Sequence, residues 1–103
     1  MKSLNQSAVG KFLIHDSTKI LNRGFFLIGE LTVGKIESGN IMLLNFSRFT
    51  ENATVEQIEG VRKLKNEIAE NLIAVKISIE IPEKHINQIR NNHKGIIAMI
   101  YEK

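Results

Sequence analysis

The chain contains no cysteine and no tryptophan, and only 6% of its 103 residues are aromatic. Without cysteine, disulfides and cysteine-ligated zinc sites are excluded. The scarcity of aromatic side chains argues against a base-stacking platform, the kind that binds single-stranded nucleic acid without sequence preference. No apolar run approaches the roughly 18 residues that a membrane-spanning helix needs. We therefore expect a cytoplasmic protein with no membrane partner.

Groups suited to catalysis are also few. The chain has one aspartate, Asp16, directly after His15, and neighbouring residues on a strand point to opposite faces of the sheet. Ser17 follows at once, whereas a catalytic triad needs three groups that converge. Three potential ligands later in the chain fit no standard zinc spacing, namely Glu83, His85 and His93. We expect no enzyme activity, no catalytic residues, no metal site and no cofactor.

The charge balance is mildly basic, with 14 Lys and Arg against 11 Asp and Glu. Such a surplus permits contact with a polyanion but does not require one. Because 43% of the residues are hydrophobic, a chain of this length can form one hydrophobic core without disulfides or a structural metal. We predict an N-terminal arm over residues 1–10 and a single domain over residues 11–103.

Alternating apolar residues and abundant isoleucine favour strands over most of this domain. Pro82 is placed to open a short helical turn over the residues that follow it. Strands are expected at residues 11–15, 25–34, 41–46, 72–81 and 95–101, with polar connections at 16–19 and 47–53.

Four glycines fall at equal steps of five, and we assign each a separate role. Gly24 and Gly39 lie in turns, and Gly34 ends a strand. Apolar positions change parity across Gly29, which predicts a β-bulge at that residue. The residues that carry this pattern are Phe26, Ile28, Leu31 and Val33. A strongly coiled hairpin of this kind favours an all-β fold, a small closed antiparallel barrel of six to seven strands.

The stretch from Thr54 to Val75 gives conflicting signals. Apolar residues recur there at steps of three and four, which is a helical period. Against a helix, Gly60 interrupts the stretch, and the residues in the first half of the stretch are compatible with a strand. Helix and strand both remain open on these observations.

The glycine series, taken with two further stretches, resembles the second domain of translational GTPases, the family of elongation factor Tu. In that family an Arg-Gly pair precedes glycines at intervals of five, and Arg23 and Gly24 match the pair. Residues 11–13 resemble the opening of that domain, and residues 58–67 resemble its Val-Glu-Met-Phe-Arg-Lys-Leu stretch. The resemblance covers residues 11–102. It implies a barrel of the translation-protein type, with a strand at 55–64 and a loop at 65–71.

The resemblance also implies a binding role. In the family this domain helps to hold the aminoacyl end of tRNA and rests against the small ribosomal subunit. By match, Glu59 corresponds to a glutamate near the terminal adenine, and Arg62 to an arginine near the terminal phosphates. The rival interpretation is that both belong to a solvated face. Further candidates for contact with a polyanion are Arg23, Arg48, Lys63 and Lys65.

The sequence contains no P-loop and no Asn-Lys-x-Asp motif, so the resemblance implies no GTP hydrolysis by these residues. We therefore predict a non-catalytic binding module that contacts tRNA, rRNA or a translation-related protein. The alternative is a protein-interaction or homodimerising barrel with no RNA role.

Overall fold

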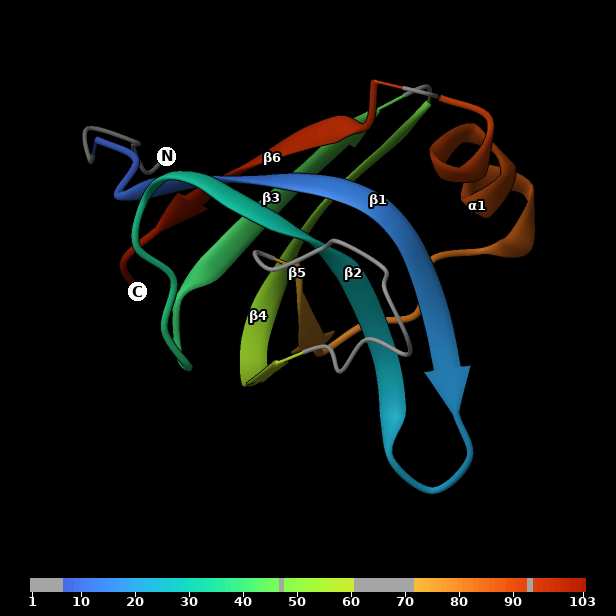
Figure 1. The fold of residues 1–103 in the computed structure, drawn as a ribbon, viewed down its shortest axis with the longest axis horizontal. Coiled ribbons are helices and arrows are strands. Elements are labelled where there is room, and N and C mark those ends of the chain that lie inside the picture. The colour runs from blue at the N-terminus through green and yellow to red at the C-terminus, as the bar shows by residue number, and fades with distance from the viewer. Residues whose placement is uncertain (1–6, 47, 61–71, 93) are drawn as a thin grey trace, which may run out of the picture.

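A computed structural model describes residues 7–46, 48–60, 72–92 and 94–103, and these residues form an antiparallel β-barrel with one helix at its side (Figure 1). The predicted all-β fold class is confirmed, with six strands in the described part of the chain. The elements are β1 (Gly10–Ile20), β2 (Gly24–Gly34), β3 (Ile41–Phe46), β4 (Phe49–Gly60), β5 (Leu72–Ile77), α1 (Glu83–Arg90) and β6 (Ile96–Tyr101).

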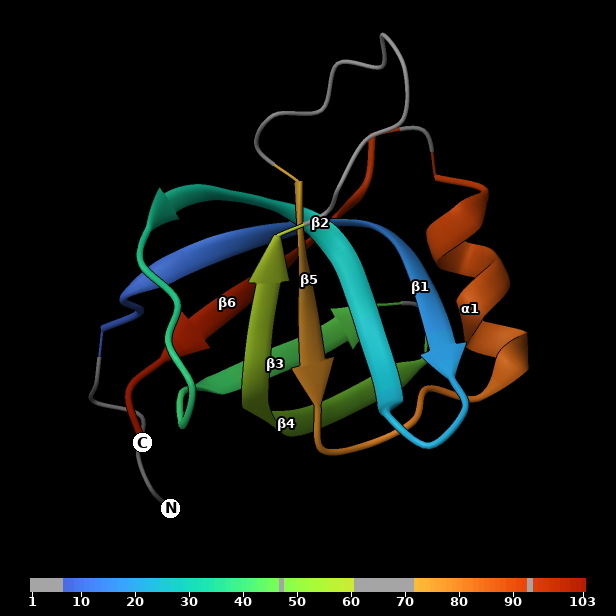
Figure 2. The ribbon, with the colours of Figure 1, turned by 60° about the horizontal axis from the view of Figure 1, so that its bottom comes forward.

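The barrel closes because β1 pairs on both sides, and the strand order around it is β1-β2-β5-β4-β3-β6. Gly10 lies opposite Gly34 of β2 and also opposite Ile100 of β6. Figure 2 shows the strands running around a common interior, with α1 beside β1. Each strand pairs with a neighbour on both sides over part of its length, whereas residues 16–20 of β1 pair with β2 alone. Over the closed part of the barrel, other molecules meet side chains on the outer walls.

The core fills the barrel with alternate residues of every strand, as a period of two requires. Fully buried side chains come from each strand: Phe12, Ile14, Leu27, Met42, Leu44, Val55, Val75 and Ile100. The same alternation places the intervening residues on the outer walls, and this division fixes which polar groups are available for binding.

Three of the four glycine predictions are confirmed. Gly24, Gly34 and Gly39 have positive φ angles of 123°, 74° and 96°, a region that side chains disfavour. Gly24 opens β2, Gly34 ends it, and Gly39 lies in the turn before β3.

The bulge predicted at Gly29 is wrong in its position. Gly29 pairs with Ile14, and the extra residue beside this pair is His15, on β1. A second irregularity in the same pairing makes Thr32 the extra residue of β2. A Cβ atom on Gly29 would overlap the carbonyl oxygen of Leu13, so the position requires glycine because β1 approaches it closely.

Three predicted boundaries also need correction. Residues 16–19 continue β1, because Asp16 pairs with Ile28 of β2 after the bulge. The polar stretch at 47–53 is mostly strand, since β4 begins at Phe49 and pairs with β3 from that residue onward. The strand predicted over 72–81 ends at Ile77.

The conflict over residues 54–75 is decided where the chain is described. Residues 54–60 belong to β4 and residues 72–75 to β5, so a helix there is wrong and the strand at 55–60 is confirmed. The loop predicted at 65–71 lies outside the described residues. The apolar residues at both ends face the barrel, which explains their burial without a helical period.

The helix predicted after Pro82 is confirmed as α1. Proline suits this position because the first amides of a helix have no intrahelical acceptor. Ile86 and Ile89 are buried against the barrel, which fixes α1 beside β1. No helix among the described residues is long and apolar enough to cross a membrane.

Candidate functional site

One outer wall of the barrel, formed by β2, β5 and β4, carries the polar residues of greatest interest. Cross-strand pairing places Phe26 and Gln57 on either side of Lys76, and Glu59 beside Ala74. These residues alternate with core residues, so their side chains point outward. Together with Arg23 in the β1–β2 turn they define the Arg23–Glu59 wall, which comprises Arg23, Phe26, Gln57, Glu59 and Lys76.

The centre of this wall is an ion pair between Arg23 and Glu59, 36 residues apart in the sequence. Gln57 Nε2 also donates a hydrogen bond to the carboxylate of Glu59. The Arg23 guanidinium lies 5.1 Å from the centre of the Phe26 ring, a cation–π distance. Phe26 is buried although it is outside the core cluster. Its ring therefore lies beneath the Arg23 guanidinium on the outer side of the sheet.

Both members of the pair remain partly exposed, with 44% of the Arg23 side chain and 32% of the Glu59 side chain accessible. A guanidinium carries five N–H donors, and one carboxylate cannot accept all of them. Arg23 therefore retains donors for a phosphate, while Glu59 and Phe26 hold its orientation.

Lys76 is a member of the wall that sequence reasoning missed. It points outward between Phe26 and Gln57, and its Nζ lies 3.8 Å from Glu56 Oε1. Its stem passes Gly24, where an added Cβ atom would lie 2.7 Å from Lys76 Cε. The alternation of residues 72–81 placed Lys76 on the polar face of its strand, but only the pairing shows which neighbours it meets.

The predicted site residues separate into three groups. Arg23 and Glu59 lie together. Arg48 is exposed in the β3–β4 connection, whereas Glu59 is at the opposite end of β4. Arg62, Lys63 and Lys65 lie outside the described residues.

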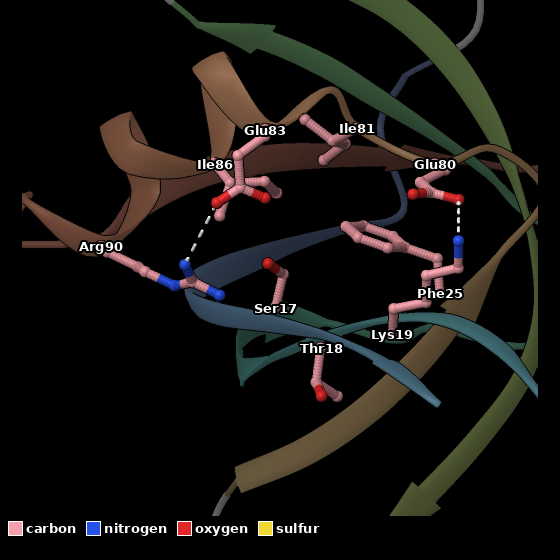
Figure 3. A pocket seen from close by; sticks show the side chains of 9 residues that line it. All are labelled: Ser17, Thr18, Lys19, Phe25, Glu80, Ile81, Glu83, Ile86 and Arg90. Carbon is pink, nitrogen blue, oxygen red and sulfur yellow. Dashed lines mark ion pairs between the residues drawn. The ribbon is translucent and has the colours of Figure 1, made fainter. Parts of the chain in front are cut away.

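A cavity of about 170 Å³ lies between α1 and the neighbouring end of the barrel (Figure 3). Two ion pairs flank it: Lys19 Nζ to Glu80 Oε1 at 3.2 Å, and Arg90 Nη1 to Glu83 Oε2 at 3.7 Å. Its lining comes from β1, β2, the segment before α1 and α1 itself, and we refer to it as the α1 cavity. The lining residues are Ser17, Thr18, Lys19, Phe25, Glu80, Ile81, Glu83, Ile86 and Arg90.

A second outer wall, on β1, β6 and β3, is largely apolar. Leu13 lies opposite Ile97, and Met99 lies opposite Leu43, with all four outside the core cluster. Ile97 is 54% exposed, as is Val33 at the end of β2. We define the apolar wall as Leu13, Val33, Leu43, Ile97 and Met99.

Groups with catalytic or metal-binding chemistry are dispersed. His15 Nε2 lies 3.1 Å from Glu30 Oε2, while Asp16 Oδ1 accepts a hydrogen bond from Arg90 Nε at 3.3 Å. The His85 ring contacts the Phe49 ring, with ring centres 5.0 Å apart and the ring planes tilted by 43°. Within the described ranges no three histidine, cysteine or acidic residues gather into a metal-binding group.

No protein-family model matches the chain, and the search of curated proteins finds no match. The resemblance to the second domain of translational GTPases therefore remains a prediction from the residues given above.

Proposed function

We propose that this protein is a non-catalytic, cytoplasmic binding module of the translation-factor type, and that its Arg23–Glu59 wall contacts RNA. The observation that carries the proposal is the contact between Arg23 and Glu59. The sequence singled out these two residues on different grounds, Arg23 for its charge and Glu59 for its match to a tRNA-contacting position. A shared surface is what an RNA-binding site would require of them.

The chemistry of the wall suits an RNA end. An arginine fork matches the geometry of a phosphate, and phosphate contacts position a protein on nucleic acid. Glu59 and Gln57 offer acceptor and donor groups to a base edge beside that phosphate. Lys76 adds a second cation to the same wall. A tRNA or an rRNA segment is the partner class that combines these features.

Binding to tRNA, measured by fluorescence anisotropy over a series of salt concentrations, tests this proposal. We expect affinity to fall steeply with salt, since phosphate contacts release counterions. Arg23→Ala should weaken binding and reduce the slope of log affinity against log salt by about one. Arg62→Ala, chosen from the sequence match, is expected to do the same.

Lys11→Ala is the matched control, because Lys11 is an exposed cation of β1 that lies between Val33 and Met99 of the apolar wall and outside the Arg23–Glu59 wall. It should leave the salt slope unchanged. Equal losses in Lys11→Ala and Arg23→Ala would indicate diffuse attraction by net charge. Absence of any tRNA or rRNA binding would reject the RNA role altogether.

The apolar wall favours a second candidate function, a barrel that pairs with a second copy of itself and has no RNA role. Exposed aliphatic residues are ordinary when they are scattered, but contiguous ones mark interaction surfaces. Leu13, Ile97 and Met99 are neighbours across β1 and β6, and none of them contributes to the core cluster. A twofold contact through this wall would cover these side chains.

Sedimentation analysis distinguishes this candidate. If the apolar wall forms a homodimer, Ile97→Lys should convert the dimer to a monomer, because two buried cations would face each other across the twofold axis. The control is Leu21→Lys, which alters an apolar residue of the β1–β2 turn that is 85% exposed, and it should leave the dimer intact. A parent protein that sediments as a monomer at its highest soluble concentration would exclude the homodimer.

A further inference from the structure

We propose that the α1 cavity binds a small zwitterion, an α-amino acid with a short apolar side chain. This site is separate from the Arg23–Glu59 wall and shares no residue with it. The inference rests on four properties of the cavity: its size, the sign of the charges at its two ends, a serine hydroxyl group directed into it and an apolar floor.

The size of the cavity limits the ligand. Its volume is about 170 Å³. An engineered protein cavity of about 150 Å³ accepts benzene, so a ligand of about six to eight non-hydrogen atoms is appropriate. A small amino acid fits within this volume, whereas a nucleotide or a sugar would extend beyond it.

The charges favour a ligand that carries both signs. Lys19 with Glu80 and Arg90 with Glu83 place a cation and an anion at each end of the cavity, as Figure 3 shows. A simple anion would face the two glutamates, and a simple amine would face the lysine and the arginine. A zwitterion can meet a group of opposite sign at both of its ends.

Ser17 supplies a hydrogen-bonding group between these ends. The residue is only 5% exposed, and its hydroxyl points into the cavity in Figure 3. The Ser17 amide donates a hydrogen bond to Asp16 Oδ1, so the hydroxyl is the polar group of this residue that faces the cavity. A serine hydroxyl can both donate and accept, so it can donate a hydrogen bond to a ligand acceptor at this point.

Arg90 determines the orientation of the ligand. Its Nε and Nη1 face Asp16 and Glu83, and among the described residues no ion pair involves Nη2. We assign the ligand carboxylate to Nη2 of Arg90 and the hydroxyl of Ser17. The ligand ammonium group then lies toward Glu80, which is half-exposed and can accept from it.

The floor of the cavity selects the side chain of the ligand. Phe25, Ile81 and Ile86 line it, and all three are buried members of the core cluster. A methyl or isopropyl group would cover this apolar surface, which favours alanine or valine over a polar amino acid.

The test is a titration of ¹⁵N-labelled protein followed by amide chemical shifts, with L-alanine, propionate and ethylamine as probes. L-Alanine should give saturable shifts at Ser17, Lys19 and Arg90. Propionate and ethylamine each lack one charge. We expect each to bind at least about tenfold more weakly than alanine, because each loses one hydrogen bond to a charged group.

Two variants and one control complete the experiment. Ser17→Ala and Glu80→Gln should each weaken alanine binding by about tenfold. Glu80 is exposed, so its variant remains informative if Ser17→Ala does not fold. Ser38→Ala changes an exposed serine outside the cavity and should bind as the parent does. Absence of saturable shifts with alanine, equal binding of propionate, or unchanged binding in both cavity variants would overturn the proposal.

Discussion

Gly29→Ala is expected to lower the free energy of unfolding by about 3 kcal/mol or more. The added Cβ atom would overlap the carbonyl oxygen of Leu13 and lie 3.0 Å from Cζ of Phe12. The first of these is a backbone atom of the paired strand, so it cannot move without separating β1 from β2. Urea denaturation followed by circular dichroism measures the loss.

Gly60→Ala is the matched control for this prediction. Gly60 also lies in a strand, but no atom of the residues that the structure describes is within 4 Å of the position that its Cβ would occupy. Removing a glycine where the backbone is compatible commonly stabilises by about 0.4–1 kcal/mol through the unfolded state. Equal stability of the two variants would show that β1 does not approach Gly29 as described.

Leu27→Ala should cost about 2–5 kcal/mol, since deleting a buried leucine loses transfer free energy and leaves a cavity. Leu27 is fully buried in the barrel and pairs with Ser17 on one side and Val75 on the other. Thermal unfolding monitored by calorimetry would record this as a decrease in the midpoint temperature.

Leu21→Ala removes the same atoms from the β1–β2 turn, where the side chain is 85% exposed. Its effect should stay within about 0.5 kcal/mol. Similar losses at Leu27 and Leu21 would mean that burial in the barrel does not determine the cost, which contradicts the division between core and outer wall.

Strand alternation in the sequence was sufficient to predict the all-β fold, and the turn glycines were placed correctly because a positive φ angle is a local property. The prediction for Gly29 was wrong because the role of this glycine is not a local property. Its role depends on the distance to Leu13 of the paired strand, which no pattern within residues 25–34 contains. The parity change that suggested a bulge arose because Phe26 is buried on the outer wall, under Arg23.

Polar stretches were mistaken for turns where tertiary contacts outweigh local propensity. Asp16 and Ser17 have turn chemistry, and the Ser17 amide does donate to Asp16 Oδ1. The chain nevertheless continues as β1, because pairing with β2 and contact with Arg90 of α1 hold it extended. Residues Thr50 to Asn52 extend in β4 because β3 supplies their partners.

The candidate site was predictable only in part. Arg23 and Glu59 were selected from the sequence, but their contact depends on the neighbouring positions of β2, β5 and β4. The α1 cavity was not predictable, because its two cations, Lys19 and Arg90, come from segments far apart in the chain. Only the closed barrel with α1 at its side brings them together.

The most direct test of the central claim, that the Arg23–Glu59 wall is the binding face, is an amide chemical-shift map of the ¹⁵N-labelled protein with deacylated tRNA. We predict changes at Arg23, Glu59 and Lys76 that disappear at high salt, with little change at Leu13 and Ile97. Changes confined to the apolar wall, or none at all, would contradict it.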